Sequence, residues 1–544
     1  MYPARNERTT DILQPMNSKL VHQIWLNIQK PEYKRFMNAC QNPFLEQEAI
    51  LQGYLRENVQ TEFGLKHHFK RIRSYKEFIQ EVPIREYKDF EEWIGKIADG
   101  QTNILTKSPV IGFEETSGTT SFSKLIPYTA ELKKEFEKGI AGWLVSLHRY
   151  HPDAFQGSAY WALSPATKPT RKTASGLPIG IEDDRDYFHP LIGWLLGSIM
   201  AVPSTLKQEK DPQKFYMKTV MSLLRREDLS FVSVWSPTFF LQLDDFLRSN
   251  RKRIMDGLND QNDWNKRRRA HVLAVLESDF VWKDLWLNLS VLSCWKDAQS
   301  EWWIPKVQKR LGDVRIQGKG LLSTEGITSI PIDPQLDPVL AVRSHFYEFR
   351  SVCYSKICLA HELSKGELYE VILTTAGGLY RYASGDLIQV TGFFKNTPCF
   401  RFVGRKDQQS DLVGEKLSEH QVLESLKFSL KRNVADISLA FLYPTQHETS
   451  IGYTLFIEKT LESRGAKEDW QNIINDLEKS LYQNPYYKQA VDIGQLNPLR
   501  VSFLSTGFRE QLVQFLSSQS TAKESTTKVP VLFPRNRLKP LLGI

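Results

Sequence analysis

Four short, apolar, β-rich segments separated by helical sequence constrain the fold of this chain most strongly. They are SAYWALS at 158–164, FVSVW at 231–235, LSVLSCW at 289–295 and DVRIQGKGLLS at 313–323. Strands that alternate with helices along a chain are typical of α/β domains. The sequence therefore predicts an α/β fold with a largely parallel sheet in its N-terminal part.

The pattern changes after residue 366. Close-set strands separated by turn residues favour antiparallel ribbons; they are ELYEVILTT, GLYRYASGDLIQVTGFF and CFRFVGRKD. After Arg405 follow a helix, two strands and a second helix, which is the pattern of a compact α+β unit. We therefore predict a large N-terminal domain with mixed sheets, residues 1–406, and a smaller α+β C-terminal domain, residues 407–544, with the boundary at Asp407.

Composition limits the classes of partner. The 544 residues include 71 basic and 63 acidic residues, a net charge of +8, and this mild excess does not separate anionic small molecules from nucleic acid. The basic runs at 251–253 and 266–269 contain no aromatic residue, so we interpret them as solvated helix faces and expect no nucleic-acid partner. The apolar stretch 191–202 is too short to span a bilayer, and we expect no membrane partner.

The cysteines and the termini predict a location. The count of five cysteines is odd, and no pair has metal-ligand spacing, which favours reduced thiols in a cytoplasmic protein. We expect no signal peptide, because the first residues contain no apolar core. The polar segment 517–528 is predicted to be a mobile loop.

A loop rich in Gly, Ser and Thr stands out at residues 115–129, ETSGTTSFSKLIPYT. We place it between a strand and a helix whose N-cap is Thr129. Glycine lets backbone amides approach phosphate oxygens, hydroxyls donate further hydrogen bonds, and Lys124 adds a charge. The alternative is a flexible surface turn. The common nucleoside-triphosphate loop is excluded, because its nearest candidate, GDVRIQGKG at 312–320, is one residue too long and lacks the hydroxyl.

Two further constellations follow. Ser323-Thr324-Glu325-Gly326 comes after an apolar strand, where a carboxylate beside hydroxyls can hold Mg²⁺. Alternatively, Glu325 is a solvated loop residue. In GLYRYASGD, residues 378–386, Asp386 can bind the two hydroxyls of a ribose, or it is an ordinary hairpin-turn residue.

In this order, SGTTS with its lysine, STEG, YRYASGD and GRKD resemble the adenylate-forming superfamily. The chain is most similar to its acyl-acid amido synthetase family, the Gretchen Hagen auxin- and jasmonate-conjugating enzymes of plants and their bacterial relatives. Further stretches carry this closer resemblance over most of the chain: TEFG at 61–64, NILTKSPV at 103–110, LSCW at 292–295, GEKLSE at 414–419 and TTKVP at 526–530.

The resemblance implies a ligase that forms an amide bond in two steps. The N-terminal domain would bind ATP, Mg²⁺ and a carboxylic acid, whose carboxylate attacks the α-phosphate, releases pyrophosphate and leaves an acyl-adenylate. The C-terminal domain would be mobile and would rotate about its hinge. An amine, usually an amino acid in this family, would then attack the carbonyl and expel AMP. We expect a monomer.

The resemblance also assigns residues. The phosphate loop would comprise Ser117, Gly118, Thr119, Thr120 and Lys124. Thr324 would contact phosphate or the acyl carboxylate, Glu325 would hold Mg²⁺, and Lys528 would bridge the phosphate and the acyl oxygen. The remaining assignments are Leu321, Tyr380, Asp386 and Arg405 for ATP, Asp407 for the hinge, and Trp235, Ser236 and Phe239 for the acid.

The chain departs from the family pattern at two places. Ser121 and bulky Phe122 occupy positions where relatives often carry a further glycine, and Leu321 stands where many relatives have an aromatic residue that stacks on adenine. Two alternatives stay open: an acyl-CoA ligase, with CoA thiol as the acceptor, and a catalytically silent nucleotide-binding protein. Alternatively, Lys528 is an exposed lysine on a flexible segment, with no role in the reaction.

Overall fold

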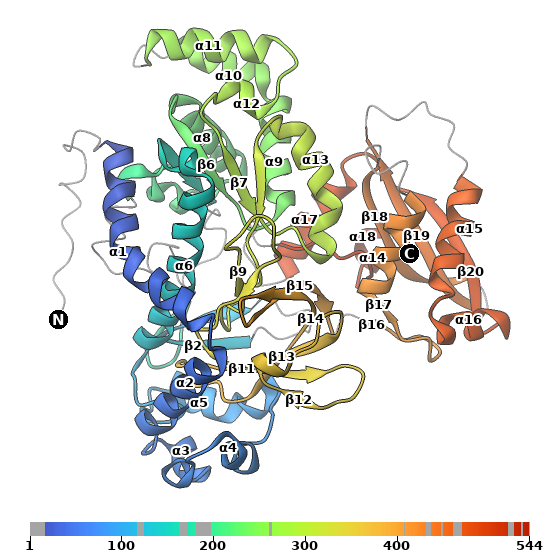
Figure 1. Ribbon diagram of the computed structural model, residues 1–544. Coiled ribbons are helices and arrows are strands. Elements are labelled where there is room, and N and C mark those ends of the chain that lie inside the picture. The colour runs from blue at the N-terminus through green and yellow to red at the C-terminus, as the bar shows by residue number, and fades with distance from the viewer. Residues whose placement is uncertain are drawn as a thin grey trace.

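The computed structural model in Figure 1 describes residues 17–116, 124–162, 171–180, 197–260, 264–406, 409–430, 437–447, 450–460, 470–519, 527–534 and 537–542. A four-stranded sheet with the order β3-β6-β7-β8 forms the first layer. Its strands are Ser158–Trp161, Leu229–Ser233, Val291–Cys294 and Arg315–Gly318, and all neighbouring pairs are parallel. The predicted α/β arrangement is thus confirmed.

Helices cover both faces of this parallel sheet. Figure 1 shows α6 (Ala130–Tyr150) on one side of it and α9 (Pro237–Ser249) and α13 (Ile304–Leu311) on the other. Every residue of β6 and β7 is buried, which is typical of parallel strands with two covered faces. The other helices of this part are α8 (Pro212–Arg225), α10 (Arg251–Asp260), α11 (Lys266–Glu277) and α12 (Trp282–Leu285).

A seven-stranded sheet with the order β12-β11-β13-β14-β15-β10-β9 follows, and all of its neighbouring strands are antiparallel. The predicted ribbons are therefore confirmed. The strands are β9 (Ser329–Ile330), β10 (Val339–Leu340), β11 (Phe346–Ser351), β12 (Ile357–Cys358), β13 (Leu368–Thr374), β14 (Tyr382–Phe394) and β15 (Thr397–Arg405). The helices of the first hundred residues are α1 (Ser18–Ala39), α2 (Pro43–Glu57), α3 (Glu62–Lys66), α4 (Tyr75–Glu81) and α5 (Glu91–Ala98).

The segment with the Gly-, Ser- and Thr-rich loop has a strand on each side. β1 (Val110–Thr116) pairs antiparallel with β2 (Lys124–Thr129), in a sheet completed by β5 (Pro178–Ile179) and β4 (Arg171–Lys172). The expected order of strand, loop and helix is therefore wrong, because β2 comes before α6. Thr129 does cap α6 as predicted, since its hydroxyl accepts a hydrogen bond from the Leu132 amide at 3.1 Å.

The C-terminal part contains the predicted helices and strands and three elements that the sequence analysis missed. The predicted ones are α14 (Glu419–Leu430), β18 (Ile437–His447), β19 (Ser450–Lys459) and α15 (Trp470–Leu481). The missed ones are α16 (Pro485–Asp492), β20 (Leu496–Phe503), which pairs parallel with β19, and α17 (Phe508–Gln519). Short β16 (Gln409–Ser410), β17 (Leu417–Ser418) and α18 (Lys539–Leu542) complete it. Residues 517–519 belong to α17, so the prediction of a mobile loop is wrong for them, and residues 520–526 lie outside the described residues.

Charged side chains connect the N-terminal and C-terminal parts. Lys306 of α13 donates a hydrogen bond to the Ile437 carbonyl at the start of β18. Arg509 of α17 forms an ion pair with Asp245 of α9. Burial of Lys306, with a further contribution from the charge of Arg509, lowers the pKa of Lys306 from its ordinary 10.5 to about 7. This lysine therefore changes charge near neutral pH.

We expect the free energy of unfolding to rise between about pH 7 and about pH 10 because of Lys306. Its pKa in the folded chain, about 7, lies below the ordinary 10.5, so in this window the unfolded chain binds more protons than the folded chain. Urea unfolding at several pH values measures the effect. Lys306→Met should flatten the rise, whereas Lys252→Met, at an exposed lysine of α10, should preserve it. An identical pH dependence in the wild type and Lys306→Met would contradict this assignment.

Candidate active site at the carboxyl edge of the parallel sheet

Three side chains suited to binding a ligand follow closely after the parallel strands. Trp235 follows β6, Trp295 follows β7 and Lys319 follows β8. Carboxyl ends of parallel strands meet at one edge of a sheet, where ligands of α/β proteins bind. The indole rings of Trp235 and Trp295 lie 5.6 Å apart between centroids, and both residues keep part of their surface exposed. This edge therefore presents accessible aromatic surface.

The loop Ser323–Gly326 extends from the same edge. The Tyr128 hydroxyl donates a hydrogen bond to the Thr324 carbonyl at 2.8 Å, and the Ser323 amide donates to the Gly326 carbonyl at 2.9 Å. Only 6% of Glu325 is exposed, and none of the described residues donates a hydrogen bond to its carboxylate. Burial of a carboxylate is costly unless hydrogen-bond donors, a cation or a ligand compensate its charge.

The charge of Glu325 reaches neighbouring groups. Burial, followed by the Glu325 charge, raises the pKa of Tyr382. Burial also raises the pKa of Tyr87 to about 12, and Glu325 adds to this rise. Lys124, at the start of β2, is partly exposed and lies over the Tyr87 ring, 5.6 Å from its centroid. The predicted phosphate-binding lysine and the predicted metal ligand thus both approach Tyr87.

A hydrogen-bonded network behind the loop fixes its shape. His345 is fully buried; its Nδ1 lies 2.9 Å from the Glu135 carboxylate, and its Nε2 accepts a hydrogen bond from the Ile327 amide at 3.0 Å. Because Nε2 is an acceptor, Nδ1 carries the ring proton and donates a hydrogen bond to the Glu135 carboxylate. The Tyr54 hydroxyl and the Ala376 amide also donate to Glu135. Sequence reasoning missed both Glu135 and His345, since neither belongs to a local motif.

Asp386 and Arg405 face each other on neighbouring strands. They are paired residues of β14 and β15, and the Arg405 guanidinium lies 3.9 Å from the Asp386 carboxylate. Arg405 also donates to the Ser384 carbonyl at 3.0 Å, and the Asp386 amide donates to the Ser384 hydroxyl at 3.1 Å. A carboxylate and a guanidinium therefore lie side by side at the paired positions of these two strands.

Lys528 reaches this region from the C-terminal part. Its ammonium lies 4.6 Å from the centroid of the Trp295 ring and 5.2 Å from that of the Phe402 ring. The pKa of Lys528 is lowered overall, because the surrounding protein removes water from the ammonium. The charges of Asp386, Glu419 and Glu325 act in the opposite direction. The residue is nevertheless solvent-exposed, so a ligand can reach it.

Three family descriptions cover most of the chain. "GH3 family N-terminal domain" matches residues 32–316, "GH3 family central domain" matches residues 338–405, and "GH3 family C-terminal domain" matches residues 420–537. The chain belongs to the GH3 family. The resemblance in the sequence is thus confirmed.

Relatives of this GH3 chain are similar over most of their length. Indole-3-acetic acid-amido synthetase GH3.4 of Arabidopsis thaliana is 22% identical over 531 residues, with 88% of each chain covered. Jasmonoyl--L-amino acid synthetase JAR4 of Nicotiana attenuata is 24% identical over 487 residues, with 81% of this chain and 83% of the relative covered.

Two solved structures share its fold. The structure described as "AtGH3.15 acyl acid amido synthetase in complex with 2,4-DB" has a TM-score of 0.82 at 18% identity and covers 100% of this chain and 97% of its own. A 2-hydroxyisobutyryl-CoA ligase in the postadenylation state has a TM-score of 0.50 at 11% identity, with 98% of this chain and 96% of the ligase covered.

Some residues predicted for the site lie in the core of the GH3 chain. Tyr380 has no exposed surface; its hydroxyl donates to the Leu105 carbonyl at 3.0 Å and its ring stacks on Phe63. Leu321 is 7% exposed and packs in the same core. Neither residue presents a surface to a nucleotide in this structure.

Two of the three residues predicted to bind the acid are also buried. Phe239 is fully buried against Tyr216. Ser236 is 3% exposed and caps α9 by accepting a hydrogen bond from the Thr238 amide. Of the three predicted residues, only Trp235 keeps accessible surface. Ser117, Gly118, Thr119, Thr120, Ser121, Phe122 and Asp407 lie outside the described residues.

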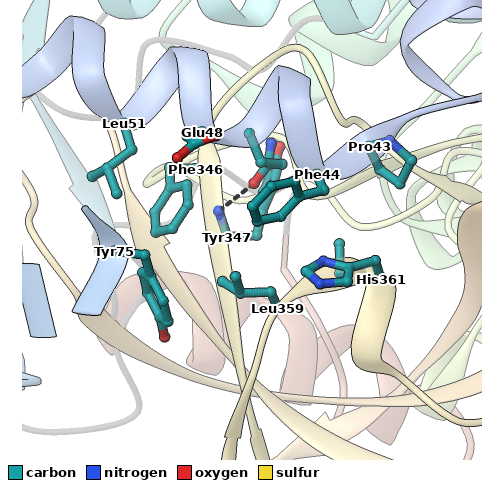
Figure 2. A pocket seen from close by; sticks show the side chains of 11 residues that line it. Pro43, Phe44, Glu48, Leu51, Tyr75, Phe346, Tyr347, Leu359 and His361 are labelled. Carbon is teal, nitrogen blue, oxygen red and sulfur yellow. Dashed lines mark hydrogen bonds between the residues drawn. The ribbon is translucent and has the colours of Figure 1, made fainter. Parts of the chain in front are cut away.

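An apolar pocket lies away from these residues. Figure 2 shows it between α2 and β11, where the exposed Phe44 packs edge-on against His361 and the Tyr347 amide donates to the Gln47 side chain at 2.8 Å. None of the predicted site residues lines it. Within the described part of the chain, no helix has the length and apolarity that crossing a membrane requires.

Gly326→Ala should destabilise the protein by about 1–3 kcal/mol through overpacking. A Cβ atom at this position would lie 2.8 Å from Nε2 of His345, and hydrogen bonds at both ring nitrogens prevent that ring from moving aside. Thermal unfolding measures the effect. Gly392→Ala is the matched control, because nothing lies within 4 Å of its added Cβ. Equal unfolding temperatures for the two variants would contradict the close packing behind the loop.

Proposed function

We propose that this GH3 protein is an ATP-dependent acyl-acid amido synthetase, a ligase that adenylates a carboxylic acid and transfers the acyl group to an amine, most simply an amino acid. One observation carries the proposal. Lys528 from the C-terminal part reaches the carboxyl edge of the parallel sheet, where its ammonium lies 4.6 Å from the centroid of the Trp295 ring. The amido synthetases among the relatives support the type of reaction.

Each of the assigned residues has a distinct role in the proposed reaction. Asp386 binds the ribose hydroxyls of ATP, with Arg405 beside it. Ser117, Gly118, Thr119, Thr120 and Lys124 surround the phosphates, and Thr324 contacts the α-phosphate or the acyl carboxylate. Lys528 donates to the α-phosphate and the acyl oxygen. Groups aimed at the oxygens that gain charge lower the barrier of phosphoryl transfer most effectively.

Glu325 fits the Mg²⁺ that the family implies. It is an almost fully buried carboxylate beside Thr324 in the loop after β8, which matches the preference of Mg²⁺ for oxygen ligands and for one or two carboxylates. When bound, the cation supplies positive charge beside the phosphates. The Tyr128–Thr324 hydrogen bond and the network behind Gly326 hold the Glu325 backbone in place.

Two bond exchanges complete the reaction. A carboxylate oxygen of the acid bonds to the α-phosphorus, and the bond to pyrophosphate breaks. The amine nitrogen then bonds to the acyl carbon, AMP leaves with one former carboxylate oxygen, and the amine releases its proton. We place the mobile C-terminal domain at residues 407–544 with the hinge at Asp407, and the N-terminal adenylation domain at residues 1–406.

The protein acts, we further propose, as a cytoplasmic monomer. All five cysteines, Cys40, Cys294, Cys353, Cys358 and Cys399, are free thiols, which supports a reducing compartment.

Acid-dependent exchange of labelled pyrophosphate into ATP tests the proposed function. We expect exchange with at least one acid from a panel of aromatic, indole and aliphatic acids, and an amide product when amino acids are added. CoA in place of the amine tests the acyl-CoA ligase alternative. ATP binding without exchange by any acid would contradict the proposal and favour a silent nucleotide-binding protein.

The variants Glu325→Gln and Lys528→Met should distinguish the metal-binding role proposed for Glu325 from the phosphate-binding role proposed for Lys528. Each should slow pyrophosphate exchange by about 10²-fold or more, because each removes a charge that faces the reacting phosphate. Only Glu325→Gln should also raise the Mg²⁺ concentration that half-maximal exchange requires. Exchange rates across a Mg²⁺ titration provide the measurement, with Lys214→Met, at an exposed lysine of α8, as the control. An unchanged Mg²⁺ requirement in Glu325→Gln would refute the assignment of the metal ligand.

A further inference from the structure

The hydroxyl of Tyr382 is buried without a hydrogen-bond partner. The residue has no exposed surface, and its hydroxyl forms no hydrogen bond with any residue that the structure describes. Burial of such a group costs free energy. Native proteins leave few buried hydroxyls in this condition, and a water, an ion or a ligand commonly supplies the missing partner. The position of this hydroxyl therefore indicates what it binds.

The backbone and the neighbouring rings fix the direction of the Tyr382 side chain. Tyr382 is the first residue of β14 and pairs with Leu373 of β13. The Phe90 ring lies edge-on to the Tyr382 ring, with the centroids 6.2 Å apart. The preceding residue, Arg381, has a left-handed backbone with a φ of 51°, and its guanidinium forms a buried ion pair with Glu348 at 2.8 Å. The fold, rather than a hydrogen bond of its own, therefore orients the hydroxyl.

Charged groups of the proposed site surround this hydroxyl. Asp386 lies on the same strand as Tyr382, and Arg405 is the cross-strand partner of Asp386. Burial raises the pKa of Tyr382, and the charges of Glu325 and Asp386 raise it further. The hydroxyl therefore keeps its proton at neutral pH and is available as a donor. Tyr87 and Arg405, which also act on it, are partly exposed, so solvent lies close to it.

The roles proposed for the two carboxylates indicate the ligand group that the hydroxyl meets. Asp386 is assigned to the ribose hydroxyls, and Glu325 is assigned to the cation beside the phosphates. The α-phosphate is the group that joins the ribose to the other phosphates, so it must pass between these two carboxylates. Hydrogen bonds to an anionic oxygen are stronger than those between neutral groups. An anionic α-phosphate oxygen is therefore a suitable partner for a neutral hydroxyl held near both carboxylates.

We infer that the Tyr382 hydroxyl donates a hydrogen bond to a non-bridging oxygen of the α-phosphate, which makes Tyr382 a further catalytic residue of the adenylation step. The inference rests on the proposed function. While the acid's oxygen bonds to the α-phosphorus and the bond to pyrophosphate breaks, the tyrosine keeps its proton and holds the phosphoryl group in line. Tyr380, two positions earlier, cannot replace it, because the Tyr380 hydroxyl donates to the Leu105 carbonyl in the core.

Two variants that each remove one hydroxyl test this assignment. Tyr382→Phe should slow pyrophosphate exchange about tenfold to a hundredfold, the range for a hydrogen bond to a charged group. It should unfold at the same temperature as the wild type or at a higher one, because the lost hydroxyl has no described partner in the free protein. Tyr380→Phe is the matched control from the core. It should unfold at a lower temperature and keep the exchange rate of the wild type.

Binding of AMP and of adenosine, measured by calorimetry, decides the assignment. Tyr382→Phe should weaken the binding of AMP about tenfold or more and leave the binding of adenosine unchanged, because only AMP carries the α-phosphate. Equal AMP affinity in the wild type and Tyr382→Phe would overturn the inference. Equal weakening of AMP and adenosine would assign the hydroxyl to the nucleoside and also overturn it. Failure of the wild type to bind AMP would instead refute the proposed function on which the inference rests.

Discussion

The contact of Lys528 with Trp295 and Phe402 joins the two parts of the molecule at the site. The lysine belongs to a short segment anchored to the C-terminal sheet, where the Leu442 amide of β18 donates to the Val531 carbonyl at 2.8 Å. The indole ring belongs to the carboxyl edge of the parallel sheet, and Phe402 belongs to β15. Lys528 therefore lies at this edge only while the C-terminal part docks in this position, so the role proposed for Lys528 would depend on the position of the C-terminal part.

The sequence predicted the layers well because their signals are local. Buried parallel strands appear as apolar runs between helices, and the four runs form one sheet in the expected region. The ribbons at β13, β14 and β15 were equally clear from close-set strands and turn residues. The strand at 124–129 was missed because Lys124, Pro127 and the capping Thr129 resemble the beginning of a helix more than a strand.

The site was harder to predict because burial depends on the whole fold. Tyr380 stands in a motif that resembles a nucleotide-binding one, yet helices of the first hundred residues cover it, and Phe63 stacks on its ring. Conversely, Glu135 and His345 are 210 positions apart and meet only through packing of α6 on the loop before β11. Lys319 stands directly after β8, and its ammonium lies over the ring of Trp143 in α6, a contact that no spacing of residues in the sequence indicates.

Transfer of a carboxylate oxygen to AMP tests the central claim most directly. The acid is labelled with ¹⁸O in its carboxylate, and the complete reaction is run with ATP, Mg²⁺ and an amino acid. The masses of the nucleotide products are then measured by mass spectrometry. The account predicts AMP that contains one ¹⁸O atom, because the oxygen that attacked the α-phosphorus leaves with it. Unlabelled AMP, or ADP with labelled phosphate, would contradict an acyl-adenylate.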